Sequence, residues 1–222
     1  MNTILKNEDE YEDLLALWSD LESGLGVVLS HPGSIQEFEL RLRQYDRWMQ
    51  DLLKRDVDLG LYLLFQLAIH SPVGYSASHA LVCAVLCHLL SEEFKLAQKE
   101  RDCLILAALT MNIAMTQLQD ELANQKTSPS LPQQLAIRGH AAKSAALVAS
   151  LGIKDELWIE TIQLHHKNSD PRVALDSLTP PHRLAHILQV VDRYAAMISP
   201  RESREGRSAS ESAQSIIRAD GE

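Results

Sequence analysis

Histidines supply the first candidate chemistry in this sequence. The adjacent pair His165-His166 closes a predicted helix immediately before a long polar loop, and at a helix end both imidazole rings can converge on one point. His140 lies near the start of another predicted helix, where its neighbours Gly139 and Ala141 leave room around the ring. Neutral imidazole is a common protein ligand for zinc, iron and related divalent ions. We therefore treat these three histidines as candidate metal ligands.

Asp192 is the carboxylate whose surroundings need explaining. It stands within the apolar helical segment 190–194. Burying a carboxylate is costly unless a cation or hydrogen bonds compensate for the lost hydration. Arg183 or Arg193 could compensate in a purely structural arrangement, and a bound cation would do the same. From the residues alone, both explanations remain open.

The other histidines have no comparable partners. His31, His70 and His88 lie in turns or on helix faces, and we expect ordinary structural roles for them. His182 and His186 are four residues apart on one predicted helix, but no third ligand lies nearby in sequence. We do not expect this pair to form a metal site of its own.

His79, Cys83 and Cys87 recur at four-residue spacing, so they share one helix face and could present soft ligands to zinc. Apolar residues surround both cysteines, however, and a buried cysteine packs as a small hydrophobic side chain. We therefore favour a packing role for the cysteines. An odd total of three cysteines, with no signal peptide, also indicates a reducing cytoplasm.

Helices must position these side chains, because the sequence has helical periodicity almost throughout and no convincing strand. Aromatic residues make up only 5% of the chain, so leucine, alanine and isoleucine must fill the core of an all-α fold. We predict helices over about 1–30, 34–52, 58–69, 78–94, 100–124, 131–151, 155–166 and 182–197. A capping box is expected at Ser34 and Glu37, a break near Asn112 and a long loop over 168–181.

The chain divides into three predicted parts. Residues 1–70 form an N-terminal helical segment that packs on the core, 71–200 form the main domain, and 201–222 form a polar, mobile tail. The formal net charge of −9 disfavours nucleic acid and anionic lipid as partners. No uninterrupted apolar stretch reaches the roughly 18 residues that a membrane span needs. We expect a cytoplasmic protein with neither nucleic-acid nor membrane partners.

Several segments taken together resemble the HD superfamily of metal-dependent phosphohydrolases, with the HD-GYP branch nearest. The resemblance covers about residues 70–201 and rests on 75–79, 107–115, His140, His165-His166 and 191–201. It implies an HD-domain-like helical bundle with additional N-terminal helices, and a branch that hydrolyses cyclic-di-GMP in bacterial signalling. It also implies metal-ligand roles for these residues: His79, His140, His165, His166 and Asp192.

The chain departs from that family at both of its named signatures. Met111-Asn112 stands where the family has its His-Asp dyad, and residues 167–171 lack the expected Gly-Tyr-Pro. The family's dyad aspartate bridges two cations and positions the attacking hydroxide. Two divalent ions about 4 Å apart repel by roughly 17 kcal/mol at an effective dielectric constant of ~20. Without that anion we do not expect a two-metal site.

One divalent ion, whether zinc, iron or manganese, could still be held by His140, His165 and His166 with a position open for water. His79 and Asp192 could bind metal too, or simply pair with each other in a buried contact. A phosphate ligand would need local cations. The candidates near the histidines in sequence are Lys143, Lys167, Arg138 and Arg172.

Two functions follow from this pattern. The first is a regulatory or ligand-sensing signalling module, a degenerate HD-GYP-like domain without cyclic-di-GMP phosphodiesterase activity. The second is a metal-dependent phosphohydrolase that acts on a nucleotide or phosphodiester through the remaining histidines. The expected partners are a nucleotide or phosphate ligand and a signalling protein. A homodimer through the N-terminal stripe around Trp18, Trp48 and Leu52 is compatible with either function, although such stripes more often pack within one chain.

Overall fold

The computed structural model describes residues 8–71, 73–167 and 173–220. Over these residues every regular element is helical, with α-helices α1 to α10 and 3-10 turns η1 to η3. The only strand-like pairing in this part of the chain is an isolated bridge between Arg201 and Arg204. The all-α prediction is therefore confirmed.

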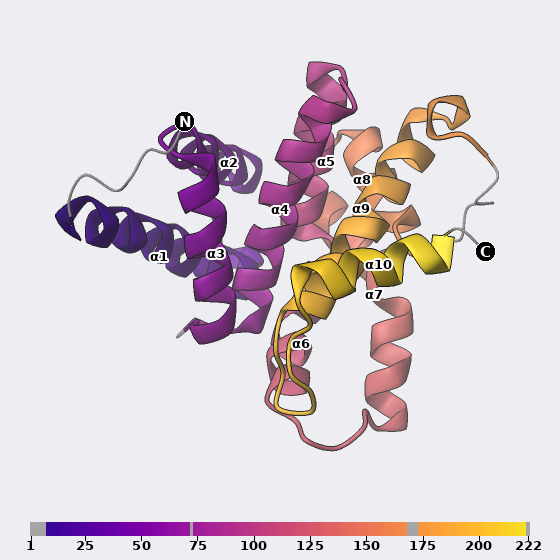
Figure 1. Ribbon diagram of the computed structural model, residues 1–222. Helices are drawn as coiled ribbons and strands as arrows, with labels where there is room; N and C mark the ends of the chain where they lie inside the picture. The colour runs from indigo at the N-terminus through magenta and orange to yellow at the C-terminus, as the bar shows by residue number, and fades with distance from the viewer. Residues whose placement is uncertain (1–7, 72, 168–172, 221–222) are drawn as a thin grey trace.

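Three N-terminal helices, α1 (Glu8–Ser30), α2 (Phe38–Leu53) and α3 (Val57–His70), lie on one side of the molecule (Figure 1). They share one hydrophobic core with the rest of the chain and meet it mainly at α4 and α5. Trp18 and Leu52 are 0% and 1% exposed. These two side chains therefore serve packing within the chain and are not available as a dimer contact.

The second helix does not begin where the sequence predicted. Ser34 ends the short turn η1 (Pro32–Ser34), and α2 starts at Phe38 after Glu37 in the left-handed conformation, with φ 51°. The proline fixes the backbone at the start of η1, so Ser34 is used inside that turn and caps no helix. The buried ring of Phe38 marks the real helix start.

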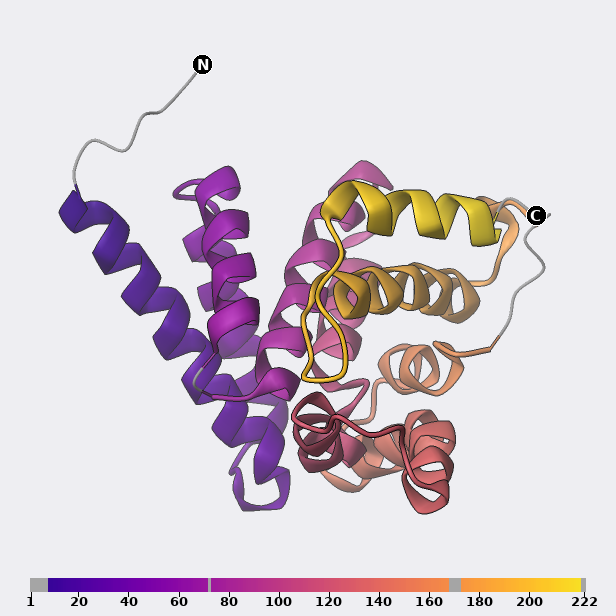
Figure 2. The ribbon, with the colours of Figure 1, turned by 60° about the horizontal axis from the view of Figure 1, so that its bottom comes forward.

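Helix α4 (Tyr75–Glu93) lies at the centre of the main domain, between the N-terminal helices and the C-terminal half (Figure 2). It contacts α1, α3, α5, α6 and α9, which explains why almost every side chain in its first three turns is buried. The other helices of this part are α5 (Gln98–Thr110), α6 (Thr116–Ala123), α7 (Leu131–Ser150), α8 (Glu156–Leu164) and α9 (Pro180–Ile198). The first three turns of α4 are buried on all sides, and accordingly this part of the α4 sequence carries no polar stripe.

The expected break near Asn112 is present. Helix α5 ends at Thr110, and Asn112, with φ −106° and ψ 7°, leads into η2 (Ile113–Met115) before α6 begins. The Ser144 hydroxyl of α7 accepts a hydrogen bond from the Ala114 backbone N–H at 3.2 Å. That contact satisfies a backbone donor at the break and fixes α7 against the bend.

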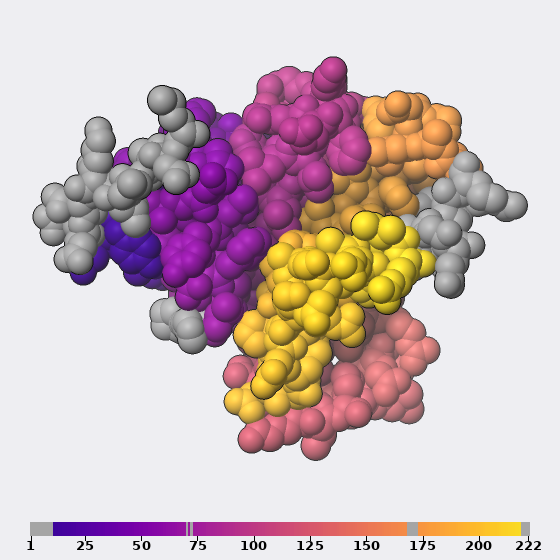
Figure 3. All heavy atoms as spheres, in the orientation of Figure 1, coloured from indigo at the N-terminus to yellow at the C-terminus, as the bar shows by residue number. Residues whose placement is uncertain are grey.

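The C-terminal tail contains a helix that the sequence reading missed. Helix α10 (Ala209–Asp220) packs alongside α9 and lies on the surface in Figure 3. A capping box starts it: the Glu211 backbone N–H donates to the Ser208 hydroxyl at 3.2 Å, and the Ser208 N–H donates to the Glu211 carboxylate at 3.0 Å. The expectation of a mobile tail is wrong for residues 209–220 because this Ser-x-x-Glu signal and the apolar Ile216 outweigh the polar composition.

One buried acid in the N-terminal helices gives the fold a pH dependence. Glu22 on α1 is 0% exposed, and burial raises the pKa of its carboxyl from 4.5 to about 7, against a smaller opposing effect of the Ser71 hydroxyl. Between these two values the unfolded chain ionises Glu22 while the folded chain keeps it protonated. The free energy of unfolding therefore falls as pH rises through this window.

We predict that Glu22→Gln stabilises the protein above neutral pH, because the amide cannot ionise inside the core. Urea unfolding at pH 8 should give a free energy of unfolding higher by on the order of 2 kcal/mol, and the difference should shrink toward pH 4.5. The matched control is Glu12→Gln, an exposed position on the same helix. Equal stability of wild type and Glu22→Gln at pH 8 would contradict the assignment.

Candidate metal centre

Three histidines from two helices meet at one point. His140 lies in α7, His165 caps the C-terminal end of α8, and His166 follows it. One nitrogen of each ring can be chosen so that all three lie within 4.8 Å of one another. His140 and His165 are buried and His166 is exposed, so the group opens to solvent on the His166 side.

Backbone carbonyls fix the protonation of two of these rings. The Nδ1 atom of His140 lies 2.5 Å from the Ile137 carbonyl oxygen, and Nδ1 of His165 lies 2.6 Å from that of Ile162. A carbonyl only accepts, so each Nδ1 must carry the hydrogen. Each neutral ring then presents a bare lone pair at Nε2.

Those lone pairs face each other. The two Nε2 atoms are 3.2 Å apart, an arrangement that is repulsive unless a proton or a cation lies between them. Burial lowers the pKa of His140 and lowers that of His165 to about 4, where the charge of His166 also contributes. A proton is thus disfavoured near neutral pH. Two nitrogen ligands of one tetrahedral zinc ion stand about 3.3 Å apart, so the donor set fits a cation.

A second group lies between α4 and α9. His79 Nε2 is 2.8 Å from Asp192 Oδ1, and Cys83 Sγ is 3.6 Å from the same nitrogen. Burial would raise the pKa of Asp192, but the His79 hydrogen bond and charge, with His165 and His166, hold it at about 2. The Asp192 carboxylate therefore interacts electrostatically with His79 and also with His165 and His166 of the first group.

His79 thus compensates for the largely buried Asp192, in the pairing of these two residues that the sequence left open beside metal binding and compensation by an arginine. Arg183, one of the arginines considered, forms an ion pair with Glu100 instead. Burial raises the pKa of both the Cys83 and Cys87 thiols, and both side chains are 0% exposed. Only Cys83 belongs to the group around Asp192.

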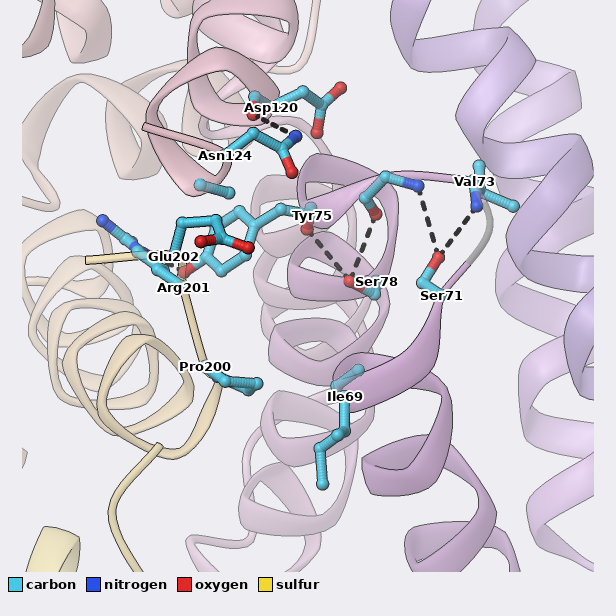
Figure 4. Close-up of a pocket in the computed structure, with 13 residues that line it drawn as sticks. Ile69, Ser71, Val73, Tyr75, Ser78, Asp120, Asn124, Pro200, Arg201 and Glu202 are labelled. Carbon is cyan, nitrogen blue, oxygen red and sulfur yellow. Dashed lines mark hydrogen bonds between the residues drawn. The ribbon is translucent and has the colours of Figure 1, made fainter. Parts of the chain in front are cut away.

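Tyr75 and Arg201 hold His79 in place. The Tyr75 ring stacks on the His79 ring at 5.3 Å between centroids, and its hydroxyl lies 3.4 Å from Nδ1. Arg201 donates to that hydroxyl at 2.7 Å and lies over the ring. Figure 4 shows both residues at a pocket of about 680 Å³ that Asp120 also lines. Sequence reasoning gave no role to Tyr75 or Arg201, because only the fold brings α4 and residue 201 together, and it favoured a packing role for Cys83.

The altered dyad offers no anion. Met111 is 0% exposed and belongs to the hydrophobic core, and Asn112, 8% exposed, carries an uncharged amide. Within the described ranges, no carboxylate oxygen lies within 4.8 Å of all three nitrogens of the His140, His165 and His166 group. The negative charge that bridges two cations in the resembling family therefore has no counterpart here.

Among the described residues, no hydrogen bond or ion pair joins the predicted phosphate contacts to the three histidines. Arg138, Lys143 and Lys167 are exposed, and Lys143 lines a separate pocket between η1, α6 and α7. Arg172 lies outside the described residues. These four positions remain predictions.

Comparison with known proteins gives one clear result. The HD domain family matches residues 76–197, more than half of the chain, and this span contains every candidate ligand named above. No curated protein and no solved structure matches. In the part of the chain that the structure describes, no helix is both long and apolar enough to cross a bilayer. The chain belongs to the HD domain family and carries a metal-dependent phosphohydrolase-like domain.

Proposed function

We propose that this HD domain is a regulatory or ligand-sensing module that holds one divalent ion at His140, His165 and His166 and does not hydrolyse cyclic-di-GMP. The observation that carries the proposal is Met111-Asn112, a buried thioether and a neutral amide, at the dyad position. A bridged pair of cations would lack the anion that offsets their mutual repulsion.

The three histidines retain what a single ion needs. Two of them, His140 and His165, donate an Nδ1–H hydrogen bond to a backbone carbonyl, which orients each ring and leaves its Nε2 lone pair free to bind an ion. A divalent ion bound there would supply Lewis acidity and a coordination position open to water or to a phosphate oxygen. The exposed side of the group, at His166, gives a ligand access.

A sensing role suits this chemistry better than phosphodiester hydrolysis. In two-metal phosphodiesterases one ion activates the nucleophile while the second stabilises the leaving oxygen. Here Asp192, the nearby carboxylate, is already engaged with His79 at 2.8 Å. We infer a nucleotide or phosphate ligand, a signalling protein partner and a bacterial, cytoplasmic setting, with a homodimer compatible with these.

The alternative is a surviving metal-dependent phosphohydrolase. It is favoured by the free nitrogens of His140 and His165, 3.2 Å apart, which keep the ligand arrangement of an open catalytic site. Such an enzyme would act on a nucleotide or another phosphate ester with one ion alone.

We predict that His165→Ala lowers the bound zinc by one ion per chain relative to the wild type, because two imidazoles hold zinc far less well than three. Elemental analysis after zinc loading and dialysis measures this. His182→Ala is the matched control, an exposed histidine outside the group, and should keep the wild-type content. Unchanged zinc in both His165→Ala and His140→Ala would exclude the three-histidine site.

We also predict no measurable hydrolysis of cyclic-di-GMP by the wild type loaded with zinc, manganese or ferrous iron. Chromatographic detection of the linear dinucleotide gives the readout. Turnover that disappears in His165→Ala but persists in His182→Ala would overturn the regulatory proposal and establish the enzyme alternative.

A further inference from the structure

Each buried histidine of the candidate metal centre is fixed to its own helix. His140 donates from Nδ1 to a carbonyl of α7, and His165 donates in the same way to a carbonyl of α8. Neither ring can turn toward the other without breaking its bond to the backbone. The 3.2 Å separation of the two Nε2 atoms is therefore set by how α7 and α8 stand relative to each other.

Helix α8 is held by a hydrogen bond from its buried tryptophan. The Trp158 indole N–H donates to the Thr110 hydroxyl at 3.0 Å, and that hydroxyl donates to the Leu106 carbonyl at 2.6 Å. Trp158 and Thr110 are both 0% exposed. An indole N–H left unpaired in the core would be costly, so this bond resists any shift of α8 away from the end of α5.

Helix α7 is held by a second hydrogen bond, close to its metal-ligand histidine. The Ala114 backbone N–H donates to the Ser144 hydroxyl at 3.2 Å. Ser144 is 0% exposed and lies about one helical turn after His140. Because α7 also packs along η2, this bond fixes the turn of α7 that carries the ligand ring.

Both attachments come from one short segment. Thr110 ends α5 and Ala114 lies in η2, on either side of Met111-Asn112. We propose that residues 110–114 position the metal centre by holding the two histidine helices, with Thr110, Ser144 and Trp158 as positioning residues for its nitrogen donors. The inference rests on the proposed function, since it concerns the ion held by the three histidines. It gives the altered dyad segment a role that requires no ligand from that segment.

Preorganisation explains why these contacts matter for an ion. Two nitrogen ligands of a tetrahedral zinc ion stand about 3.3 Å apart. The fold places the His140 and His165 nitrogens 3.2 Å apart. An ion that binds donors already held at this spacing loses little of its binding free energy to ordering the chain. When either attachment is removed, α7 or α8 can shift, and ion binding must restore the spacing.

Zinc titration of the full-length protein against a chromophoric chelator tests this inference. Thr110→Val keeps the side-chain volume and removes the hydroxyl, while Ser144→Ala removes the acceptor for the other attachment. We expect each variant to bind zinc about tenfold more weakly than the wild type, as is typical when a group that orients a metal ligand is lost. Thr110→Ser keeps the hydroxyl and should bind zinc as tightly as the wild type.

Ser91→Ala is the matched control for a purely structural loss. Ser91, 1% exposed on α4, donates its hydroxyl to the His88 carbonyl of its own helix. Its removal should lower the melting temperature and leave the zinc affinity unchanged. Cobalt gives a second readout, because its visible absorption depends on the ligand geometry. The cobalt spectrum should change in Thr110→Val and Ser144→Ala but not in Thr110→Ser or Ser91→Ala.

The outcomes separate this inference from the proposed function. If folded Thr110→Val and Ser144→Ala bind zinc as tightly as the wild type, with unchanged cobalt spectra, the inference is overturned and the three-histidine site stands. An equal loss of zinc affinity in Ser91→Ala would overturn it as well. A wild type that binds no zinc would remove the proposed function and this inference together. If circular dichroism shows that Thr110→Val does not fold, Ser144→Ala decides.

Discussion

Two backbone carbonyls control the geometry of the nitrogen donors at the candidate metal centre. Ile137 and Ile162 each accept a hydrogen bond from the histidine three residues later, and these bonds commit His140 and His165 to the same tautomer. The last carbonyls of a helix have no partner within it, so the end of α8 supplies the acceptor for His165 at no cost to the helix. The facing Nε2 lone pairs, an arrangement that suits a cation, follow from this constraint.

The position of α8 depends in turn on a buried tryptophan. Trp158, 0% exposed, donates from its indole N–H to the Thr110 hydroxyl at 3.0 Å, and Thr110 donates to the Leu106 carbonyl at 2.6 Å. This chain joins α8 to the last turn of α5. The altered dyad residue Met111 comes next along the chain, so the core contact that positions His165 also fixes the segment where the family's bridging anion would stand.

Much of this arrangement could be predicted from the sequence because the signals are local. The helix-closing pair His165-His166, the break near Asn112 and the helix that ends before Gly152 all follow from neighbouring residues. The helix over 209–220 was also local, since Ser208 and Glu211 carry a capping signal, but the polar composition obscured it.

Contacts between distant helices could not be predicted in the same way. Four-residue spacing puts His79 and Cys83 on one face of α4, yet nothing in the spacing tells which residue of α9 crosses that face. The His79–Asp192 contact joins positions 113 residues apart, and the Arg201–Tyr75 contact spans 126. Such pairings depend on how α4 and α9 pack: the family resemblance paired His79 with Asp192, and only the fold adds Cys83 to that group.

The donors that remain after the loss of the dyad decide what the centre can do. A two-metal hydrolase relies on oxygen ligands, because carboxylates bridge the ions and offset their charge. The two ligand groups in the described residues contain four imidazoles, one thiol and a single carboxylate. Nitrogen and sulfur donors hold a zinc-like ion firmly and disfavour the hard ions that activate water in pairs. With Met111 and Asn112 in place of the dyad, the group of His140, His165 and His166 therefore has no oxygen donor that two ions could share.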